Sequence, residues 1–148
     1  MKAQDIMTAN PGIVTPDDAT STAAGLMRDL DVGAIPVVDG RGTMRLVGMI
    51  TDRDITVRCV AAGHRGRCRV EDHMSADTLA TTHPDDDVQE VVAAMERERV
   101  RRVPVVTDAM RLIGIIAQAD IATRLGPTEP ARVEHLLERV SEPAHATP

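Results

Sequence analysis

The strongest constraint on the fold of this chain is an internal repeat in its sequence. Four blocks of the first half return in the same order, 68 residues later for the first two and 66 residues later for the last two. The matched pairs are TPDD (15–18) with HPDD (83–86), AIPVV (34–38) with RVPVV (102–106), LVGMI (46–50) with LIGII (112–116), and Asp54-Ile55 with Asp120-Ile121. The sequence therefore predicts two copies of one structural unit.

The first copy reads as strand, helix, strand, strand, helix. The TPDD block predicts a helix start, because proline suits a first helical turn and carboxylates favour the positive end of the helix dipole. Apolar residues at helical spacing then continue to Leu30. Strands are predicted at 35–39 and 44–50, followed by a helix that Thr51 or Asp52 caps and that Gly63 ends.

The second copy follows the same plan. A helix is predicted from Asp85 and Asp86, strands at 103–106 and 111–116, and a helix at 118–125. One copy alone is too short to bury a good core, so two copies are expected to pack with pseudo-two-fold symmetry and to form clefts between them. The predicted class is α/β (α+β), divided into a first repeat (1–66), a second repeat (67–126), and a C-terminal helix and tail (127–148).

These blocks resemble the CBS domain family. The two Pro-Val-Val strands fit the family, and the run GMITDRDI at 48–55 follows its pattern of Gly, two apolar residues, Thr or Ser, two variable residues, Asp and an apolar residue. The resemblance extends from about Asp5 to Leu125 and is closest to stand-alone CBS pairs, the hypoxic response protein group among them. It implies a tandem-repeat regulatory module (a Bateman module) that is not an enzyme and that acts in a stress response.

The resemblance also implies a binding site for an adenosine nucleotide in the cleft between the repeats. Carried over by position, Asp54 accepts hydrogen bonds from both ribose hydroxyls, and Thr51 hydrogen-bonds phosphate at a helix N-terminus. Thr15, Ile35 and Val37 line the adenine, whose edge is read by backbone groups. AMP, ADP or ATP is the expected ligand, and no tightly bound cofactor is expected.

Further contacts are predicted from Arg53 and, in the second copy, from Arg102 and Asp120. The second copy carries Ala117 where the first has Thr51, so it lacks a hydroxyl for phosphate. A hydrogen bond to a charged group contributes about 1.5–3 kcal/mol, or about 10- to 150-fold in affinity. The first site is therefore expected to be the stronger one.

Composition bears on the partners. The net charge of −6 and the absence of Phe, Tyr and Trp exclude general nucleic-acid binding, which needs basic surfaces and aromatic stacking. No apolar run reaches the roughly 18 residues of a membrane helix, and no signal peptide is recognisable, so a cytoplasmic protein is expected. The family resemblance implies a homodimer that signals in trans to an effector protein, which the sequence does not identify.

Four residues form a second constellation with the spacing Cys-x4-His-x3-Cys-x4-His, namely Cys59, His64, Cys68 and His73. Zinc uses these residue types, but the spacing differs from common zinc fingers. We therefore expect no metal site, with one core cysteine, one linker cysteine and two surface histidines. Two alternatives to the nucleotide module stay open: a ligand-free structural dimerisation module, and a thiol- or metal-responsive sensor that uses Cys59 and Cys68. No catalytic motif stands out.

Overall fold

The computed structural model describes residues 1–65, 67–77 and 79–142, and its chain folds into two compact units of mixed helix and strand. The first-repeat unit contains Asn10–Leu79 and Ala109–Leu112, and the second-repeat unit contains Met1–Ala9, Ala80–Asp108 and Ile113–Pro148. The division expected from the sequence (1–66, 67–126, 127–148) consists of continuous segments. Each compact unit instead combines segments that are separated in the sequence. The last six residues of the predicted tail lie outside the described residues.

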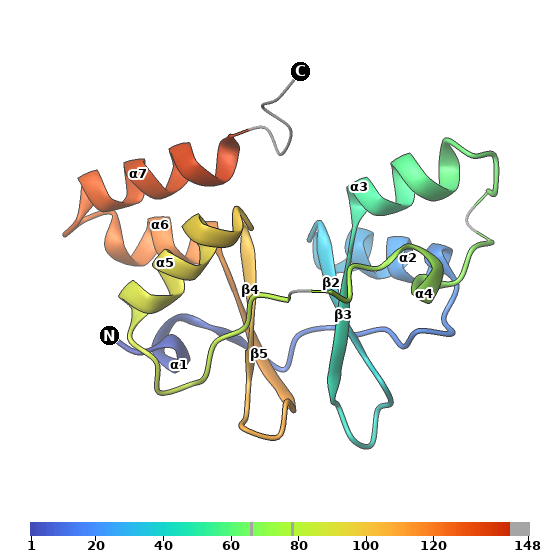
Figure 1. Cartoon of the computed structure of the whole chain (residues 1–148), viewed down its shortest axis with the longest axis horizontal. Coiled ribbons are helices and arrows are strands. Elements are labelled where there is room, and N and C mark those ends of the chain that lie inside the picture. The colour runs from blue at the N-terminus through green and yellow to red at the C-terminus, as the bar shows by residue number, and fades with distance from the viewer. Residues whose placement is uncertain (66, 78, 143–148) are drawn as a thin grey trace. The chain divides into compact units, whose positions relative to one another are not determined.

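The first-repeat unit has a two-stranded antiparallel sheet of β2 and β3 with helices beside it (Figure 1). In the sheet, Ala34 lies opposite Thr51 and Ile35 lies opposite Ile50. The predicted strands around 35–39 and 44–50 and the helices that flank them are confirmed, although α2 starts late and the last helix continues as a π-helix. The first predicted strand of the repeat is reduced to an isolated bridge between Val14 and Val37. The elements are α2 Thr20–Leu30, β2 Ala34–Val38, β3 Leu46–Thr51, α3 Asp52–Asp54, the π-helix η1 Ile55–Val60 and α4 Val70–His73.

The second-repeat unit repeats this plan with a three-stranded sheet in the order β1-β5-β4. Its last helix, α7, confirms the C-terminal helix that the sequence predicts within 127–148. The elements are α1 Ala3–Ile6, β1 Thr8–Ala9, α5 Val88–Glu98, β4 Arg102–Val106, β5 Leu112–Ala117, α6 Gln118–Leu125 and α7 Pro130–Ser141. Among the described residues, no helix is both long enough and apolar enough to cross a membrane.

The prediction that the two Pro-Asp-Asp motifs begin helices is wrong. In the first motif the Asp18 carboxylate accepts a hydrogen bond from the Thr15 N–H at 2.9 Å and closes a turn, and α2 begins only at Thr20. In the second motif α5 begins at Val88, and Asp87 is its N-cap. Short acidic side chains compete with helical hydrogen bonds by binding nearby backbone N–H groups, which explains the later starts.

Each unit is completed by a short helix from a distant part of the sequence. In the first-repeat unit the Val70 N–H donates to the Asp18 carbonyl at 2.8 Å. In the second-repeat unit the Ala3 N–H donates to the Asp86 carbonyl, also at 2.8 Å. Residues 1–8 and 68–75 are therefore equivalent, which is a part of the repeat that the four matched blocks did not contain.

A methionine after each short helix packs against a glycine of the neighbouring strand. A Cβ atom on Gly48 would lie 2.8 Å from the Met74 sulfur, and one on Gly114 would be still closer to the Met7 sulfur. A larger residue at either position would force the methionine side chain to move, so glycine permits this close approach. The same methionine–glycine contact in both units supports the alignment of residues 1–8 with 68–75.

Each unit has its own hydrophobic core. Met27 lies in the core of the first-repeat unit, and Met95 lies in the core of the second-repeat unit. The core of the first-repeat unit consists of Val14, Ala23, Met27, Ile35, Val37, Ile50, Ile55 and Val70.

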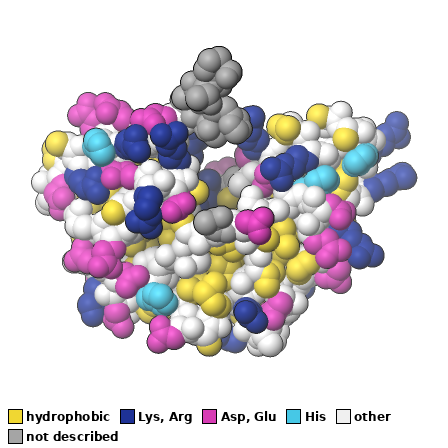
Figure 2. Space-filling view, in the orientation of Figure 1, with side chains coloured by type: hydrophobic (Ala, Val, Ile, Leu, Met, Phe, Trp, Pro, Cys, Tyr) yellow, Lys and Arg dark blue, Asp and Glu magenta, His cyan; other side chains and the backbone are white. Residues whose placement is uncertain are grey.

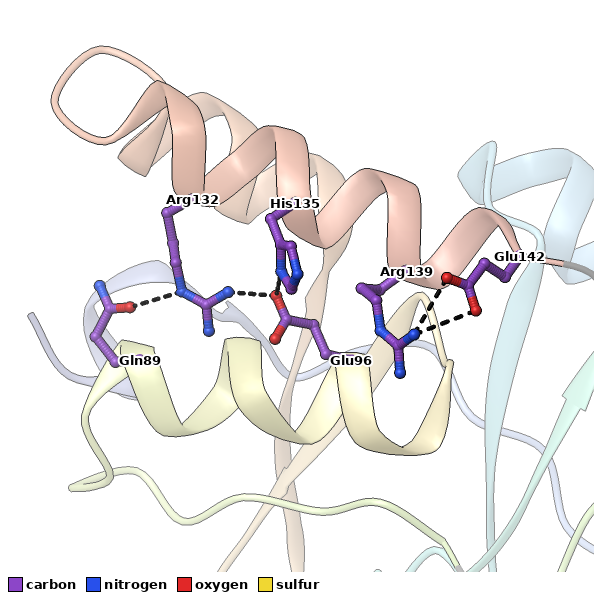
Figure 3. A network of polar contacts seen from close by, with 6 residues as sticks. All are labelled: Gln89, Glu96, Arg132, His135, Arg139 and Glu142. Atoms are coloured by element: carbon purple, nitrogen blue, oxygen red, sulfur yellow. Dashed lines mark hydrogen bonds and ion pairs between the residues drawn. The ribbon is translucent and has the colours of Figure 1, made fainter.

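Helix α7 is held to α5 by a polar network as well as by apolar packing (Figure 3). Glu96 of α5 accepts a hydrogen bond from the Arg132 guanidinium and pairs with His135 Nδ1 at 3.0 Å. Burial of the Glu96 carboxylate raises its pKa, but the hydrogen bonds from Arg132 and His135 outweigh burial and hold the pKa below its ordinary value. Glu96 is therefore ionised in the folded protein at neutral pH.

Candidate functional site

The junction between β3 and α3 holds two of the predicted ligand-binding residues in one capping box. The Asp54 N–H donates to the Thr51 hydroxyl oxygen at 3.1 Å, and the Thr51 N–H donates to Asp54 Oδ2 at 2.9 Å. Thr51 has an extended backbone, as an N-cap residue requires, with φ −114° and ψ 162°. The sequence predicted Thr51 or Asp52 as the cap, and the structure shows that Thr51 is the N-cap residue.

The capping box leaves specific polar atoms available. Thr51 uses its hydroxyl oxygen as an acceptor, and its O–H donates to no residue in the described part of the chain. Asp54 uses Oδ2, and its Oδ1 has no hydrogen bond to any described residue. Both side chains are half-buried, so one donor and one ionisable acceptor stand side by side at a partly protected position.

The backbone N–H groups of this helix start are less available than the sequence predicts. The Asp52 N–H donates to the Gly33 carbonyl at 2.9 Å, and the Arg53 N–H donates to the Asp52 carboxylate at 2.8 Å. The third N–H, of Asp54, is taken by Thr51. An anionic group at this junction would therefore have to rely on the Thr51 O–H and the exposed side chain of Arg53, or displace the Asp52 carboxylate.

The predicted adenine-contacting residues lie in the adjacent strand but point inward. Ile35 is 1% exposed and Val37 is fully buried, and both side chains belong to the core of the first-repeat unit. Their side chains are therefore not available to line an adenine in this structure. That backbone groups of this strand read the base stays a prediction.

Thr15 is not brought to the junction. Its neighbour Val14 pairs with Val37, whereas Thr51 pairs with Ala34, three residues or about 10 Å away along β2. The Thr15 hydroxyl donates to the Asp17 carboxylate at 2.8 Å, which lowers the pKa of Asp17. A ligand would have to extend along β2 to contact both Thr15 and Thr51.

The equivalent junction of the second repeat has the same backbone but fewer polar atoms. The Ala117 N–H donates to Asp120 Oδ2 at 2.7 Å, so the carboxylate has the same orientation without a neighbouring hydroxyl. Arg102, at the start of β4, is half-buried. Gln118, the residue after Ala117, has a buried side-chain oxygen with no hydrogen-bond partner among the described residues. The sequence analysis did not identify this feature.

A second cluster of polar side chains lies in the first-repeat unit, at the far end of the helix that begins after Thr51. One side-chain atom each from Cys59, His64, Cys68 and His73 lies within 4.8 Å of all the others. Cys59 is fully buried, Cys68 and His73 are half-buried, and His64 is exposed. The expected core position of Cys59 and surface position of His64 are confirmed, whereas His73 is half-buried and the four residues lie together.

Local backbone geometry explains this clustering. Cys59 lies in the π-helix, and the His64 N–H donates to the Cys59 carbonyl at 3.1 Å, so His64 begins the return of the chain beside Cys59. Gly63 makes the reversal with a φ of +81°, a conformation that glycine adopts without strain. The Cys68 carbonyl then accepts from the Thr20 N–H at 2.8 Å, and α4 carries His73.

The contacts within the cluster are short. His64 Nδ1 lies 3.0 Å from the Cys68 sulfur, and the Thr20 hydroxyl lies 3.5 Å from the Cys59 sulfur. Both cysteines are thiols rather than a disulfide. Hydrogen bonding with Cys59, followed by partial burial, raises the pKa of Cys68 to about 11. The Nε2 atom of His73 is buried and has no hydrogen-bond partner in the described residues.

The surface around this cluster is basic. Figure 2 shows Lys or Arg side chains (dark blue) and His side chains (cyan) at the right-hand edge, over the end of the helix labelled α3 in Figure 1. A shallow depression there is lined by Gly63, His64, Arg65, Arg67 and Cys68. The cluster can therefore be reached from solvent.

Comparisons with known proteins agree with the repeat. The family model of the CBS domain matches residues 3–60 and 70–126. Hypoxic response protein 1 of Mycobacterium tuberculosis is 37% identical over 123 residues, which cover 83% of this chain and 84% of the relative. The CBS domain-containing protein YhcV of Bacillus subtilis is 37% identical over 128 residues, covering 86% and 88%.

Two solved structures extend the comparison. Hypoxic Response Protein I with two coordinated zinc ions superposes with a TM-score of 0.74 at 36% identity, over 84% of this chain and 99% of the other. The CBS domain pair of protein MJ0100 in complex with 5′-methylthioadenosine and S-adenosyl-L-methionine gives a TM-score of 0.77 at 27% identity, over 87% and 98%.

Proposed function

Since this chain belongs to the CBS domain family, we propose that it is a regulatory module whose first repeat binds an adenosine-type ligand at the β3–α3 junction. The observation that carries the proposal is the pairing of Thr51 and Asp54 in one capping box. That pairing fixes both side chains while leaving the Thr51 O–H and Asp54 Oδ1 available.

The chemistry of this pair suits a nucleoside. An ionised carboxylate oxygen accepts hydrogen bonds from the two hydroxyls of a ribose, and a hydroxyl donor beside it suits a phosphate oxygen. Arg53 is exposed next to both and supplies positive charge. The MJ0100 pair, which has the same fold, was crystallised with two adenosine compounds, and this supports a ligand of the same class here. AMP, ADP and ATP would use Thr51 and Arg53 most fully.

We propose a weaker site in the second repeat. Asp120 keeps the orientation of Asp54, and Arg102 supplies a half-buried cation, but Ala117 offers no hydroxyl. The missing hydrogen bond to phosphate corresponds to about 1.5–3 kcal/mol, or about 10- to 150-fold in affinity.

The proposed output is self-association and signalling to an effector protein. Val57 and Val60 are 50% and 56% exposed on η1, which begins at the residue after Asp54. Leu30 and Val32, at the end of the neighbouring α2, are also exposed. A ligand on Asp54 would therefore act on a helix with an exposed apolar face, of the kind that favours a homodimer.

Thermal unfolding with AMP, ADP, ATP, NAD and S-adenosylmethionine tests the proposal. Binding to the folded state at 100 times the dissociation constant adds about 2.7 kcal/mol to the free energy of unfolding. We expect at least one compound to raise the midpoint, and Asp54→Asn to remove that shift, because asparagine keeps the cap but loses one acceptor oxygen. Asp52→Asn is the control and should keep the shift.

No midpoint shift with any compound would contradict the proposal and would favour the ligand-free dimerisation module. Sedimentation of the same samples checks the second part of the proposal. A monomer at all concentrations, unchanged by Val57→Ser, would contradict self-association through η1.

A further inference from the structure

We propose that Cys59, His64, Cys68 and His73 form a Zn²⁺ site of the Cys₂His₂ type within the first-repeat unit. Its ligands come from the π-helix η1, from the segment 61–69 that follows it, and from the end of α4. This inference goes beyond the nucleotide site and does not depend on it.

The first support is geometric. Tetrahedral zinc with Zn–S bonds of about 2.3 Å and Zn–N bonds of about 2.0 Å places neighbouring ligand atoms roughly 3.3–3.8 Å apart. All four candidate atoms already lie within 4.8 Å of one another, and one nitrogen–sulfur pair is at 3.0 Å. Side-chain adjustments of about 1 Å therefore suffice to surround one ion.

The second support is an unexplained buried atom. His73 Nε2 is buried and finds no partner among the described residues, although burying an imidazole nitrogen without a hydrogen bond is unfavourable. A metal ion in the cluster would satisfy a histidine nitrogen as a ligand. A merely structural histidine would be expected to have a hydrogen-bond partner.

The third support is the second-repeat unit, where the equivalent positions are apolar. Leu125 stands in the position of Cys59, and Ile6 in that of His73, and both belong to the core of that unit. The fold therefore needs no polar group at these positions. The first-repeat unit instead gathers two sulfur and two imidazole side chains at the same place.

The donor set identifies the class of metal. Two thiolates and two imidazoles suit Zn²⁺, whereas Mg²⁺ and Ca²⁺ take oxygen ligands. Two thiolates also balance the charge of the dication, so a neutral site results beside the exposed Arg65 and Arg67. Four protein ligands fill a tetrahedral site and leave no open position for substrate, which indicates a structural role rather than catalysis.

A metal ion at this site would link the segment 61–69 to the helices η1 and α4. His64 and Cys68 lie on that segment, whereas Cys59 and His73 belong to the helical elements that it connects. Arg65 and Arg67 are exposed within it and are sites for trypsin. Loss of the metal should therefore loosen this segment and increase cleavage there.

The test begins with metal analysis of the full chain, purified under reducing conditions without chelator. We expect about one zinc per chain, and cobalt substitution should give the thiolate charge-transfer and ligand-field bands of a tetrahedral site. His64→Gln should lower the zinc content strongly, and it should fold because His64 is exposed. Cys68→Ser should remove the thiolate contribution of one ligand from the cobalt spectrum.

The control variant is His83→Gln, which changes a histidine outside the cluster and should keep one zinc and an unchanged cobalt spectrum. Trypsin digestion of the chelated protein should cut faster after Arg65 and Arg67 than digestion of the zinc form, while cleavage after Arg97 stays equal. Two results would overturn the proposal: no zinc and no cobalt spectrum in the reduced protein, or zinc that both His64→Gln and Cys68→Ser leave unchanged. A Cys59–Cys68 disulfide in the freshly purified protein, detected by thiol titration after denaturation, would overturn it as well.

Discussion

The two units have the same backbone plan, but they differ at equivalent positions of the two proposed sites. At the strand-to-helix junction the first-repeat unit has Thr51 where the second has Ala117. Near the other end of the same helix it has Cys59 where the second has Leu125. The comparison teaches which features the fold requires and which are specific to one repeat.

The common features are backbone interactions. In both junctions a strand-end N–H donates to the aspartate that follows three residues later, at 2.9 Å for Thr51 and 2.7 Å for Ala117. The helix therefore starts in the same way with or without the hydroxyl. The aspartate has a structural role in both units, whereas the hydroxyl of Thr51 is the part that a ligand would require.

The largest expected effect is on stability and concerns Leu125, the apolar counterpart of Cys59. Leu125 is 3% exposed in the core of the second-repeat unit, so Leu125→Ala should lower the free energy of unfolding by about 2–5 kcal/mol. Chemical denaturation in the presence of a chelator measures this. Cys59→Ala under the same conditions should cost less, because it removes a smaller side chain. Equal losses would contradict the distinction between the two positions.

The second effect concerns ligand affinity at the first junction. Thr51→Val keeps the shape of the side chain but removes the O–H, so affinity for a phosphate-bearing adenosine ligand should fall about 10- to 150-fold. Isothermal titration with AMP and ATP measures the loss. Binding that is unchanged by this substitution would show that the hydroxyl serves only as a cap.

A reciprocal change should make the second junction resemble the first. Ala117→Thr supplies an N-cap oxygen for the Asp120 N–H, and an N-cap hydroxyl stabilises a helix by about 1 kcal/mol. Thermal and urea unfolding should show this gain without ligand. A loss of stability would mean that the second junction has no room for the hydroxyl, contrary to the equivalence of the two units.

The smallest effect concerns α7 of the second-repeat unit. The pKa of Glu96 is lowered in the folded state, so its contribution to stability is present above its unfolded value near 4.5 and is lost as pH falls through the folded pKa. Between about pH 5 and pH 3 the wild type should lose about 0.5–1 kcal/mol more than Glu96→Gln. Urea unfolding at a series of pH values measures the difference, and parallel curves would contradict it.

Much of the fold followed from the sequence because the repeat sets the order of strands and helices. The strand blocks at 34–38 and 102–106 and the run after Gly48 were sufficient to identify the family. The equivalence of α1 and α4 was missed, because the segments share few identical residues and each short helix bonds to the repeat that it does not precede in the sequence, α1 to Asp86 and α4 to Asp18.

The convergence of Cys59, His64, Cys68 and His73 could not be predicted from spacing alone. The four residues do not have finger spacing, and their convergence depends on the π-helix and on the reversal at Gly63. At the β3–α3 junction the pairing could be predicted from spacing, because Thr51 and Asp54 are three residues apart and local helix geometry brings them together. Thr15 was grouped with them by resemblance, but sheet register places it at the other end of β2.

The most direct test of the central claim is calorimetric titration of the wild type, Asp54→Asn and Asp120→Asn with AMP, ATP and S-adenosylmethionine, in matched buffers. The account predicts that Asp54→Asn abolishes the tighter binding event, whereas Asp120→Asn leaves its affinity unchanged. If Asp54→Asn binds as tightly as the wild type, or if Asp120→Asn alone removes the tighter event, the assignment of the ligand to the first junction is contradicted.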